Sequence, residues 1–158
     1  CQDRTHRLRR ARPHHGQAYD QRDSYCNHPS ASCHGTCLLR IRRLRPLTTA
    51  RLVQLVQDSS LVTADALREI ATYADAVGVF RRLLVPAATG APPTSVVRGA
   101  QAAGLKVHAW TLRPERQFLA PRYGGDPLAE VRELAALGVD GMFGDYPDQL
   151  LRALGASP

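Results

Sequence analysis

The sequence predicts an α/β protein built around a parallel β-sheet. Short β-favouring runs alternate with stretches of helical apolar spacing, in the order strand then helix, four times along the chain. Gly104 and Gly138 follow two of these helical stretches directly, where helix C-caps favour glycine. Polar and aromatic side chains gather just after the strands, which is where parallel α/β proteins bind their ligands.

The predicted strands are short runs rich in Val, Ile, Leu and aromatic residues. They lie at residues 52–56, 74–79, 106–111 and 139–143. The predicted helices lie at residues 63–72, 95–103, 127–137 and 147–154. Thr63 and Thr94 are the expected N-caps of the first two helices. Residues 41–47 fit the tail of an earlier helix, and residues 85–93 and 112–125 are predicted loops.

The composition divides the chain near residue 45. Residues 1–45 contain ten Arg and three Asp, whereas residues 46–158 contain eleven basic and eleven acidic side chains. The formal charge of +7 therefore belongs to the N-terminal part and says nothing about the substrate of the rest. No run of about 18 apolar residues occurs, so we expect no membrane span.

We expect residues 1–40 to be an irregular basic leader and residues 41–158 to be the folded domain. The leader lacks sustained periodicity and is rich in Arg, His, Ser, Pro and Cys, so it has little apolar surface to bury. Such a composition is also typical of a GC-rich gene read out of frame, which is our hypothesis for its origin. The chain starts at Cys1 and its only methionine is Met142, so we expect a fragment, a processed chain or an incomplete gene prediction.

A second hypothesis makes the leader a noncatalytic binding module for zinc or nucleic acid. Five potential zinc ligands lie within twelve positions, namely Cys26, His28, Cys33, His34 and Cys37. Cys33 and Cys37 form a C-x3-C pair, but Cys26 and His28 are poorly spaced as the second pair. The arginines would attract phosphates nonspecifically, and no recognition helix indicates a specific nucleic-acid site.

The stretch from Gly104 to Asp148 resembles the C-terminal end of the glycerophosphodiester phosphodiesterase family. The strand KVHAWT, starting at Lys106, and the loop RPERQFL, starting at Arg113, match the family pattern. The last strand, GVDGMFGDYPD from Gly138, matches it most specifically, with Gly144 in place of the usual Thr. The resemblance covers roughly residues 41 to 155.

The resemblance implies that the four strand–helix units are the C-terminal half of a (β/α)8 TIM barrel. A complete barrel typically needs about 250 residues, so 158 residues are few for one. Half a barrel has two open sheet edges, so we expect either self-association through those edges or failure to fold stably. Relatives are often periplasmic or secreted, but the sequence shows no signal peptide and assigns no compartment.

The resemblance also implies a hydrolase that splits glycerophosphodiesters into an alcohol and glycerol 3-phosphate. The family uses a divalent cation, Ca²⁺ or Mg²⁺, with histidines as acid and base, from H-R-G, E-N/D-x-D and E-x-K motifs. This sequence contains no H-R-G and no Glu before Glu69. We therefore expect no catalytic residue, no bound metal and no activity in this chain alone.

Three residues near strand ends remain as candidates for the substrate pocket. Trp110 matches the family position that lines the pocket against the glycerol moiety, although a buried structural role stays open. His108 lies two residues earlier, on the same strand face, and fits an interior packing role better than proton transfer. Asp145 closes the last strand, where it either anchors the barrel mouth or caps the final helix.

Overall fold

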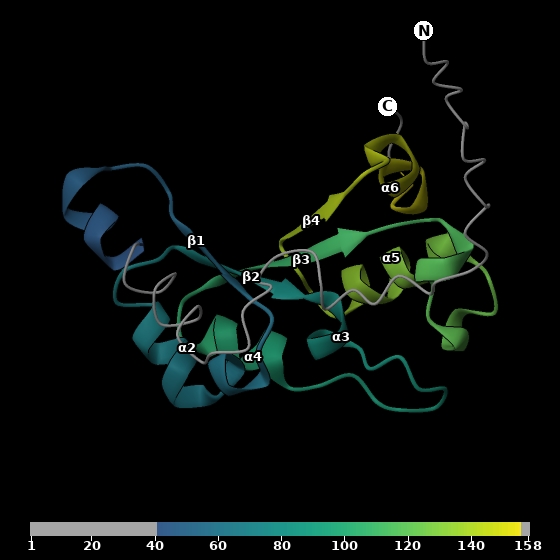
Figure 1. The fold of residues 1–158 in the computed structure, drawn as a ribbon, viewed down its shortest axis with the longest axis horizontal. Helices are drawn as coiled ribbons and strands as arrows, with labels where there is room; N and C mark the ends of the chain where they lie inside the picture. The colour runs from purple at the N-terminus through teal and green to yellow at the C-terminus, as the bar shows by residue number, and fades with distance from the viewer. Residues whose placement is uncertain (1–40, 156–158) are drawn as a thin grey trace, which may run out of the picture.

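A computed structural model describes residues 41–155, and their core is a four-stranded parallel sheet (Figure 1). The strands are β1 (Val53–Val56), β2 (Ala76–Phe80), β3 (Lys106–Leu112) and β4 (Gly141–Gly144). They pair in chain order, β1-β2-β3-β4. The predicted parallel α/β class is confirmed, and each predicted strand end lies within two residues of the observed one.

The main helices follow the strands as the sequence predicts, with ends within two residues of expectation. They are α2 (Ala64–Ile70), α4 (Val96–Ala102), α5 (Pro127–Ala136) and α6 (Pro147–Ala153). A short helix, α3 (Arg81–Leu84), was not predicted, because four residues are too few to show a helical period. None of the helices in the described part of the chain is long and apolar enough to cross a bilayer.

Helix ends follow the local chemistry of the sequence. The Thr63 hydroxyl accepts a hydrogen bond from the Ala66 amide at 3.3 Å and caps α2 as predicted. At α4 the N-cap is Ser95, without a side-chain bond, while the predicted cap Thr94 accepts from the Val96 amide at 3.4 Å. Gly104 and Gly138 have φ angles of 82° and 83°, the left-handed conformation that glycine adopts without strain after a helix.

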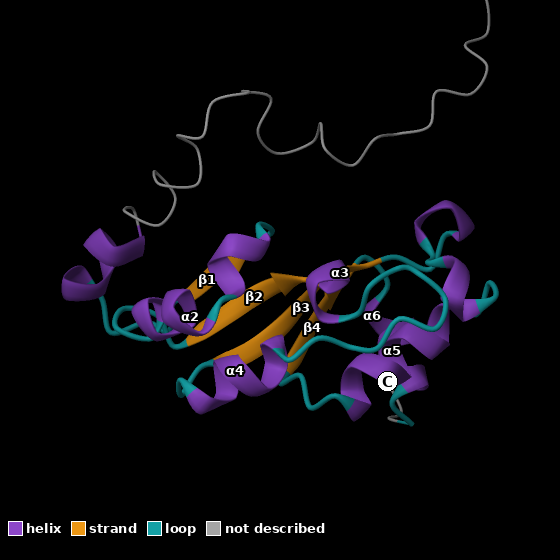
Figure 2. Ribbon diagram, turned by 90° about the horizontal axis from the view of Figure 1, so that it is seen from below, coloured by secondary structure: helices purple, strands orange, loops and turns teal. Residues whose placement is uncertain are grey.

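Among residues 41–155, helices cover one face of the sheet and leave the other open. Buried side chains of β1, β2 and β3 point to the covered face and pack with Leu67, Ile70, Val97 and Leu134 of the helices. The strand residues of this core are Val56, Val77, Val79, Val107 and Ala109. In Figure 1, α2, α3 and α4 lie below the strands, and Figure 2 shows the same layering from below.

Asp140 ties the start of β3 to the start of β4. Its carboxylate accepts hydrogen bonds from the Val107 amide at 2.9 Å and from Lys106 Nζ at 2.7 Å. These bonds, that from Lys106 first, hold the pKa of Asp140 below its ordinary value of 3.8. Asp140 therefore fixes the register of these two strands, beyond the turn role that its sequence position suggests.

Replacing Asp140 by alanine is expected to lower the free energy of unfolding by about 1–2 kcal/mol, because the Val107 amide loses its acceptor. A lowered native pKa means that the unfolded state binds the proton more readily. The stabilisation is thus present above pH 3.8 and lost as the pH falls through the native pKa. Urea unfolding at pH 7 and pH 3 checks this, and an equal loss in wild type and variant on acidification would contradict it.

Candidate functional site

Charged residues follow three adjacent strands and meet at the carboxyl-terminal edge of the sheet. Arg81 and Arg82 come directly after β2, Arg113 follows β3 and Asp145 follows β4. Because the strands are parallel, these residues lie at one end of the half-barrel. This edge is where barrel proteins of this class place their active sites.

Glu130 of α5 joins the two arginines in a buried cluster. Arg81 Nη1 donates to Glu130 Oε2 at 2.5 Å, and Arg82 Nη1 donates to Glu130 Oε1 at 2.8 Å. The side chains of Arg81 and Glu130 are each only 2% exposed. Both arginines also donate through Nη2 to the Phe118 carbonyl, at 2.7 and 3.1 Å. The cluster therefore fastens the end of β2, helix α5 and the loop after β3 to one another.

The cluster holds two cations and one carboxylate, so it carries an excess positive charge inside the protein. Burial first, and then the adjacent Arg81 charge, lower the pKa of Arg82. Glu130 is essential to this arrangement because it is the carboxylate that offsets both guanidinium groups. The sequence analysis missed the cluster. Its one signal was a pair of consecutive arginines directly after a buried strand.

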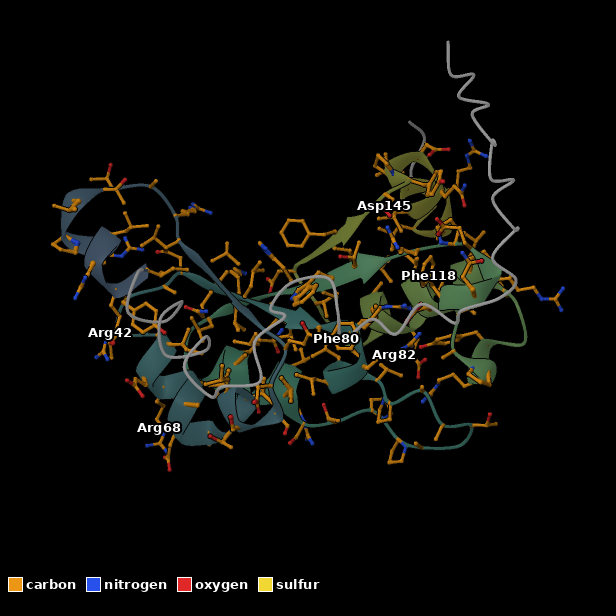
Figure 3. The ribbon with its side chains drawn as sticks, in the orientation of Figure 1. Arg42, Arg68, Phe80, Arg82, Phe118 and Asp145 are labelled. Atoms are coloured by element: carbon orange, nitrogen blue, oxygen red, sulfur yellow. The ribbon has the colours of Figure 1, made fainter. Side chains whose placement is uncertain are left out.

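Asp145 pairs with Arg113, whose Nε donates to Asp145 Oδ2 at 2.7 Å. The Arg113 guanidinium also lies over the Phe118 ring, 4.6 Å from its centroid. Asp145 does not cap α6, whose N-cap is Tyr146 without a side-chain bond. Asp145 thus pairs with Arg113, and its role at the barrel mouth stays a prediction. Figure 3 labels Asp145, Phe118 and Arg82 along this edge.

Trp110 lies on the open face of the sheet and not in the helical layer. A Cβ built on Gly78 would lie 3.6 Å from Trp110 Cδ1 and would also meet Leu55, which is 52% exposed on that face. Trp110 Nε1 donates to the Gly78 carbonyl at 2.8 Å, and its ring lies 5.5 Å from that of Phe80. Gly78 thus lets the indole approach the neighbouring strand, and the ring position is fixed by a hydrogen bond. Its role in a substrate pocket stays a prediction.

His108 occupies the same face, two residues before Trp110, as its position in the strand predicts. Its ring meets Phe143 edge-on, with centroids 5.7 Å apart and planes at 72°. Gly141 leaves room for the imidazole, because a Cβ there would lie 2.9 Å from His108 Cδ2. These contacts are those of a packed aromatic side chain. The structure groups His108 with Trp110 on the open face. Asp145 lies apart from them, with Arg113, at the carboxyl-terminal ends of β3 and β4.

A small cavity lies between β3, α5 and α6, lined in part by Leu112, Arg113, Glu130, Tyr146 and Leu150. Its volume is about 10 Å³, room for roughly one water molecule. The cavity does not include Trp110 or His108. The described half-barrel therefore encloses no substrate-sized pocket at this position.

The residues at this edge do not fit a divalent cation. Calcium and magnesium require several oxygen ligands from free carboxylates or carbonyls. Asp145 is bound by Arg113, and Glu130 is bound by both Arg81 and Arg82. Within residues 41–155, no group of three His, Cys, Asp or Glu side chains gathers in a way that could hold a metal. The potential zinc ligands of the leader lie outside the described residues.

The model of the glycerophosphoryl diester phosphodiesterase family matches residues 27–149 of this chain. The chain belongs to this family. The match begins fourteen residues before residue 41, where we place the start of the folded domain, and that boundary stays a prediction. The family resemblance stated from the last-strand motif is thereby confirmed.

Known proteins of the family are similar to this chain over part of their length. Glycerophosphodiester phosphodiesterase GDPD6 of Arabidopsis thaliana is 36% identical over 93 residues, which is 56% of this chain and 25% of the relative. A crystal structure of a Silicibacter pomeroyi protein assigned as a glycerophosphoryl diester phosphodiesterase superposes with a TM-score of 0.51 at 23% identity. That superposition covers 76% of this chain and 36% of the other, and it supports the partial-barrel fold.

Gly144 replaces the threonine of the family pattern, and the structure explains why glycine suits this chain. A Cβ at Gly144 would lie 2.7 Å from Leu150 Cδ1 and 3.1 Å from the Leu112 carbonyl oxygen. Gly144→Thr is therefore expected to cost about 1–3 kcal/mol, because the Leu150 side chain must turn away and the Leu112 carbonyl must shift slightly. Thermal unfolding of G144T measures this, and Gly144→Thr combined with Leu150→Ala should recover part of the loss. A variant as stable as wild type would contradict the packing argument.

Proposed function

We propose that this chain supplies the C-terminal part of a glycerophosphodiester phosphodiesterase site and does not complete the reaction alone. In that reaction a water oxygen attacks phosphorus, the bond from phosphorus to the alcohol oxygen breaks, and the alcohol leaves with a proton. The products are the alcohol and glycerol 3-phosphate. Enzymes of the family bind a divalent cation, which neutralises charge on the phosphate.

The observation that supports this role is the position of Trp110 on the open face of the last half of the barrel. Its indole is held by the Gly78 carbonyl and packed against Phe80, so the ring keeps one orientation before any substrate arrives. Such a fixed apolar surface suits the carbon chain of a glycerol group. Arg113, 38% exposed, lies at the same end of the sheet, and Asp145 offsets its charge. It offers the phosphodiester a guanidinium, a group suited to phosphate, without a net positive charge.

The proposed lack of phosphodiesterase activity in this chain alone is argued from its sequence. The chain contains no H-R-G motif and no Glu before Glu69, so the carboxylates that hold the family's cation have no counterpart ahead of the first described strand. The carboxylates Asp145 and Glu130 at the strand ends are bound by arginines. No residue of the described part is therefore assigned to general acid or base catalysis.

The first experiment assays the purified 158-residue chain for release of glycerol 3-phosphate from glycerophosphocholine, with Ca²⁺ or Mg²⁺ added. The expected result is a rate equal to that without protein. Turnover that depends on the cation and disappears with a chelator would overturn the proposed inactivity. It would leave the family membership unchanged.

A second experiment tests the pocket role separately, by ligand-observed NMR with glycerol 3-phosphate. Saturable binding is expected for the wild type and for Leu154→Ala, an exposed change outside the sheet. Trp110→Ala should weaken this binding by about 5- to 150-fold, because about 1–3 kcal/mol of apolar contact is removed. Equal affinity of W110A and wild type would remove Trp110 from the pocket.

A further inference from the structure

Phe118 and Arg113 belong to the same loop, between β3 and α5, and their side chains are in contact. The Arg113 guanidinium carbon lies over the Phe118 ring, 4.6 Å from its centroid. A guanidinium is planar, and it is attracted to the face of an aromatic ring both as a cation and by stacking. The ring therefore gives the Arg113 side chain a flat surface to lie on, in addition to the hydrogen bond that Arg113 makes with Asp145.

The hydrogen bond to Asp145 does not by itself define how the guanidinium plane is tilted. Arg113 Nε donates to Asp145 Oδ2 at 2.7 Å, and a hydrogen bond through Nε fixes one direction only. The two side chains are 38% and 41% exposed, and ion pairs this accessible to water hold their geometry weakly. A further contact is needed to define the plane, and the Phe118 ring supplies one.

The backbone of Phe118 is held by the buried charge cluster. Phe118 ends the one-turn helix η4 (Arg116–Phe118), and its amide donates to the Glu115 carbonyl at 2.8 Å. Its own carbonyl accepts hydrogen bonds from Nη2 of Arg81 at 2.7 Å and of Arg82 at 3.1 Å. Bonds from charged donors are stronger than those from neutral ones. The ring under Arg113 is thus attached to a part of the loop that is fixed on both its amide and its carbonyl side.

We propose that Phe118 is a positioning residue of the phosphodiesterase site, which holds the Arg113 guanidinium in the orientation that receives the substrate phosphate. The role of Arg113 at the phosphate rests on the function proposed above, whereas the contact between Phe118 and Arg113 does not. Asp145 already offsets the charge of Arg113, so a defined orientation is what Arg113 contributes. A guanidinium that is already ordered loses less freedom when an anion binds, and it therefore binds the anion more tightly.

The first test measures how firmly Arg113 is held in the full chain. Phe118→Leu removes the ring but keeps an apolar side chain and the carbonyl that Arg81 and Arg82 bind. The Arg113 Nε–Hε signal in ¹H–¹⁵N spectra, assigned by its loss in Arg113→Lys, should exchange with water about 2- to 5-fold faster in F118L. Phe118→Tyr keeps the ring and should retain the wild-type rate. Phe143→Leu, which removes a 46% exposed ring on β4, should also retain it.

Backbone amide exchange separates the orientation of Arg113 from the stability of the loop. Amides of residues 113–120 should exchange at the same rate in F118L and wild type, because the bonds to the Phe118 carbonyl remain. Faster exchange of these amides in F118L would show that the ring holds the loop instead of the guanidinium, and would overturn the proposal. An unchanged Arg113 Hε rate in F118L, or a rate in F118Y as fast as in F118L, would also overturn it.

The second test measures the affinity for glycerol 3-phosphate by ligand-observed NMR. F118L should bind about 2- to 5-fold more weakly than wild type, and F118Y should bind equally well. Equal affinity of F118L and wild type would remove Phe118 from the site. If the wild type does not bind glycerol 3-phosphate, the proposed function fails and with it the role of Phe118 at the phosphate. The Hε exchange rates would still decide whether Phe118 holds Arg113.

Discussion

Replacing Glu130 by glutamine is expected to lower the free energy of unfolding by about 3–5 kcal/mol. The substitution keeps the shape of the side chain but removes the negative charge that offsets both Arg81 and Arg82. Arg81 is 2% exposed, so its charge cannot regain water without local unfolding. Unfolding in urea, a denaturant without charge, measures this loss at pH 7.

The matched control is Asp148→Asn on α6. Asp148 pairs with Arg152 at 2.9 Å, but both side chains are about half exposed or more, at 49% and 66%. Such surface pairs contribute about 0.3–0.5 kcal/mol, so D148N should change stability little. Similar losses in E130Q and D148N would show that the buried cluster contributes no more than a surface ion pair.

Glu130→Gln should also have a local consequence at the carboxyl-terminal ends of the strands. Arg81 and Arg82 also donate to the Phe118 carbonyl, so their displacement should free the loop between β3 and α5. We expect faster amide exchange at residues 113–120 in E130Q than in D148N under conditions where both are folded. This readout separates loss of the cluster from general destabilisation.

Leu134→Ala should cost about 3–5 kcal/mol, the second large effect. Leu134 is fully buried on α5, the helix that also carries Glu130. Truncation leaves a cavity between α5 and the sheet, and the close-packed surroundings refill it only partly. Urea unfolding measures the loss, and Leu151→Ala on α6, where the leucine is 39% exposed, should cost less than about 1 kcal/mol.

An equal cost for L134A and L151A would show that α5 is not anchored through Leu134. If L134A instead lowers the m-value as well as the midpoint, the native state has loosened around α5. The expected result is a lower midpoint with an unchanged m-value, since the sheet and α2 and α4 should keep their packing.

The strands and main helices could be predicted because their signals are local. Apolar period, the Thr63 cap and the glycines after helices are all visible within a few residues of each element. The glycine conformations at Gly104 and Gly138 confirm how closely such signals fix a helix end. Helix α3 escaped prediction because a single turn of four residues has no period.

The charged network at the strand edge could not be predicted, because it joins residues far apart in sequence. Glu130 lies 49 positions from Arg81. It shares the buried face of α5 with Val131 and Leu134, but that period does not say which cations it meets. The Arg113 to Asp145 pair spans 32 positions. Local pattern places each residue on its element but does not say which charges of neighbouring units meet. The family pattern placed Trp110 near a strand end, but its hydrogen bond to the Gly78 carbonyl could not be predicted from the sequence.

The order of the strands in the sheet has a consequence for how the protein can be made. Each strand pairs only with the strand before it or after it in the chain, so every pairing joins consecutive β/α units. A chain leaving the ribosome can therefore add each strand to a sheet edge that already exists, without waiting for a distant segment. Of the described strands, β4 emerges after the other three, and its arrival brings Asp145 to Arg113. The Arg113–Asp145 pair therefore forms in the same step in which β4 joins β3.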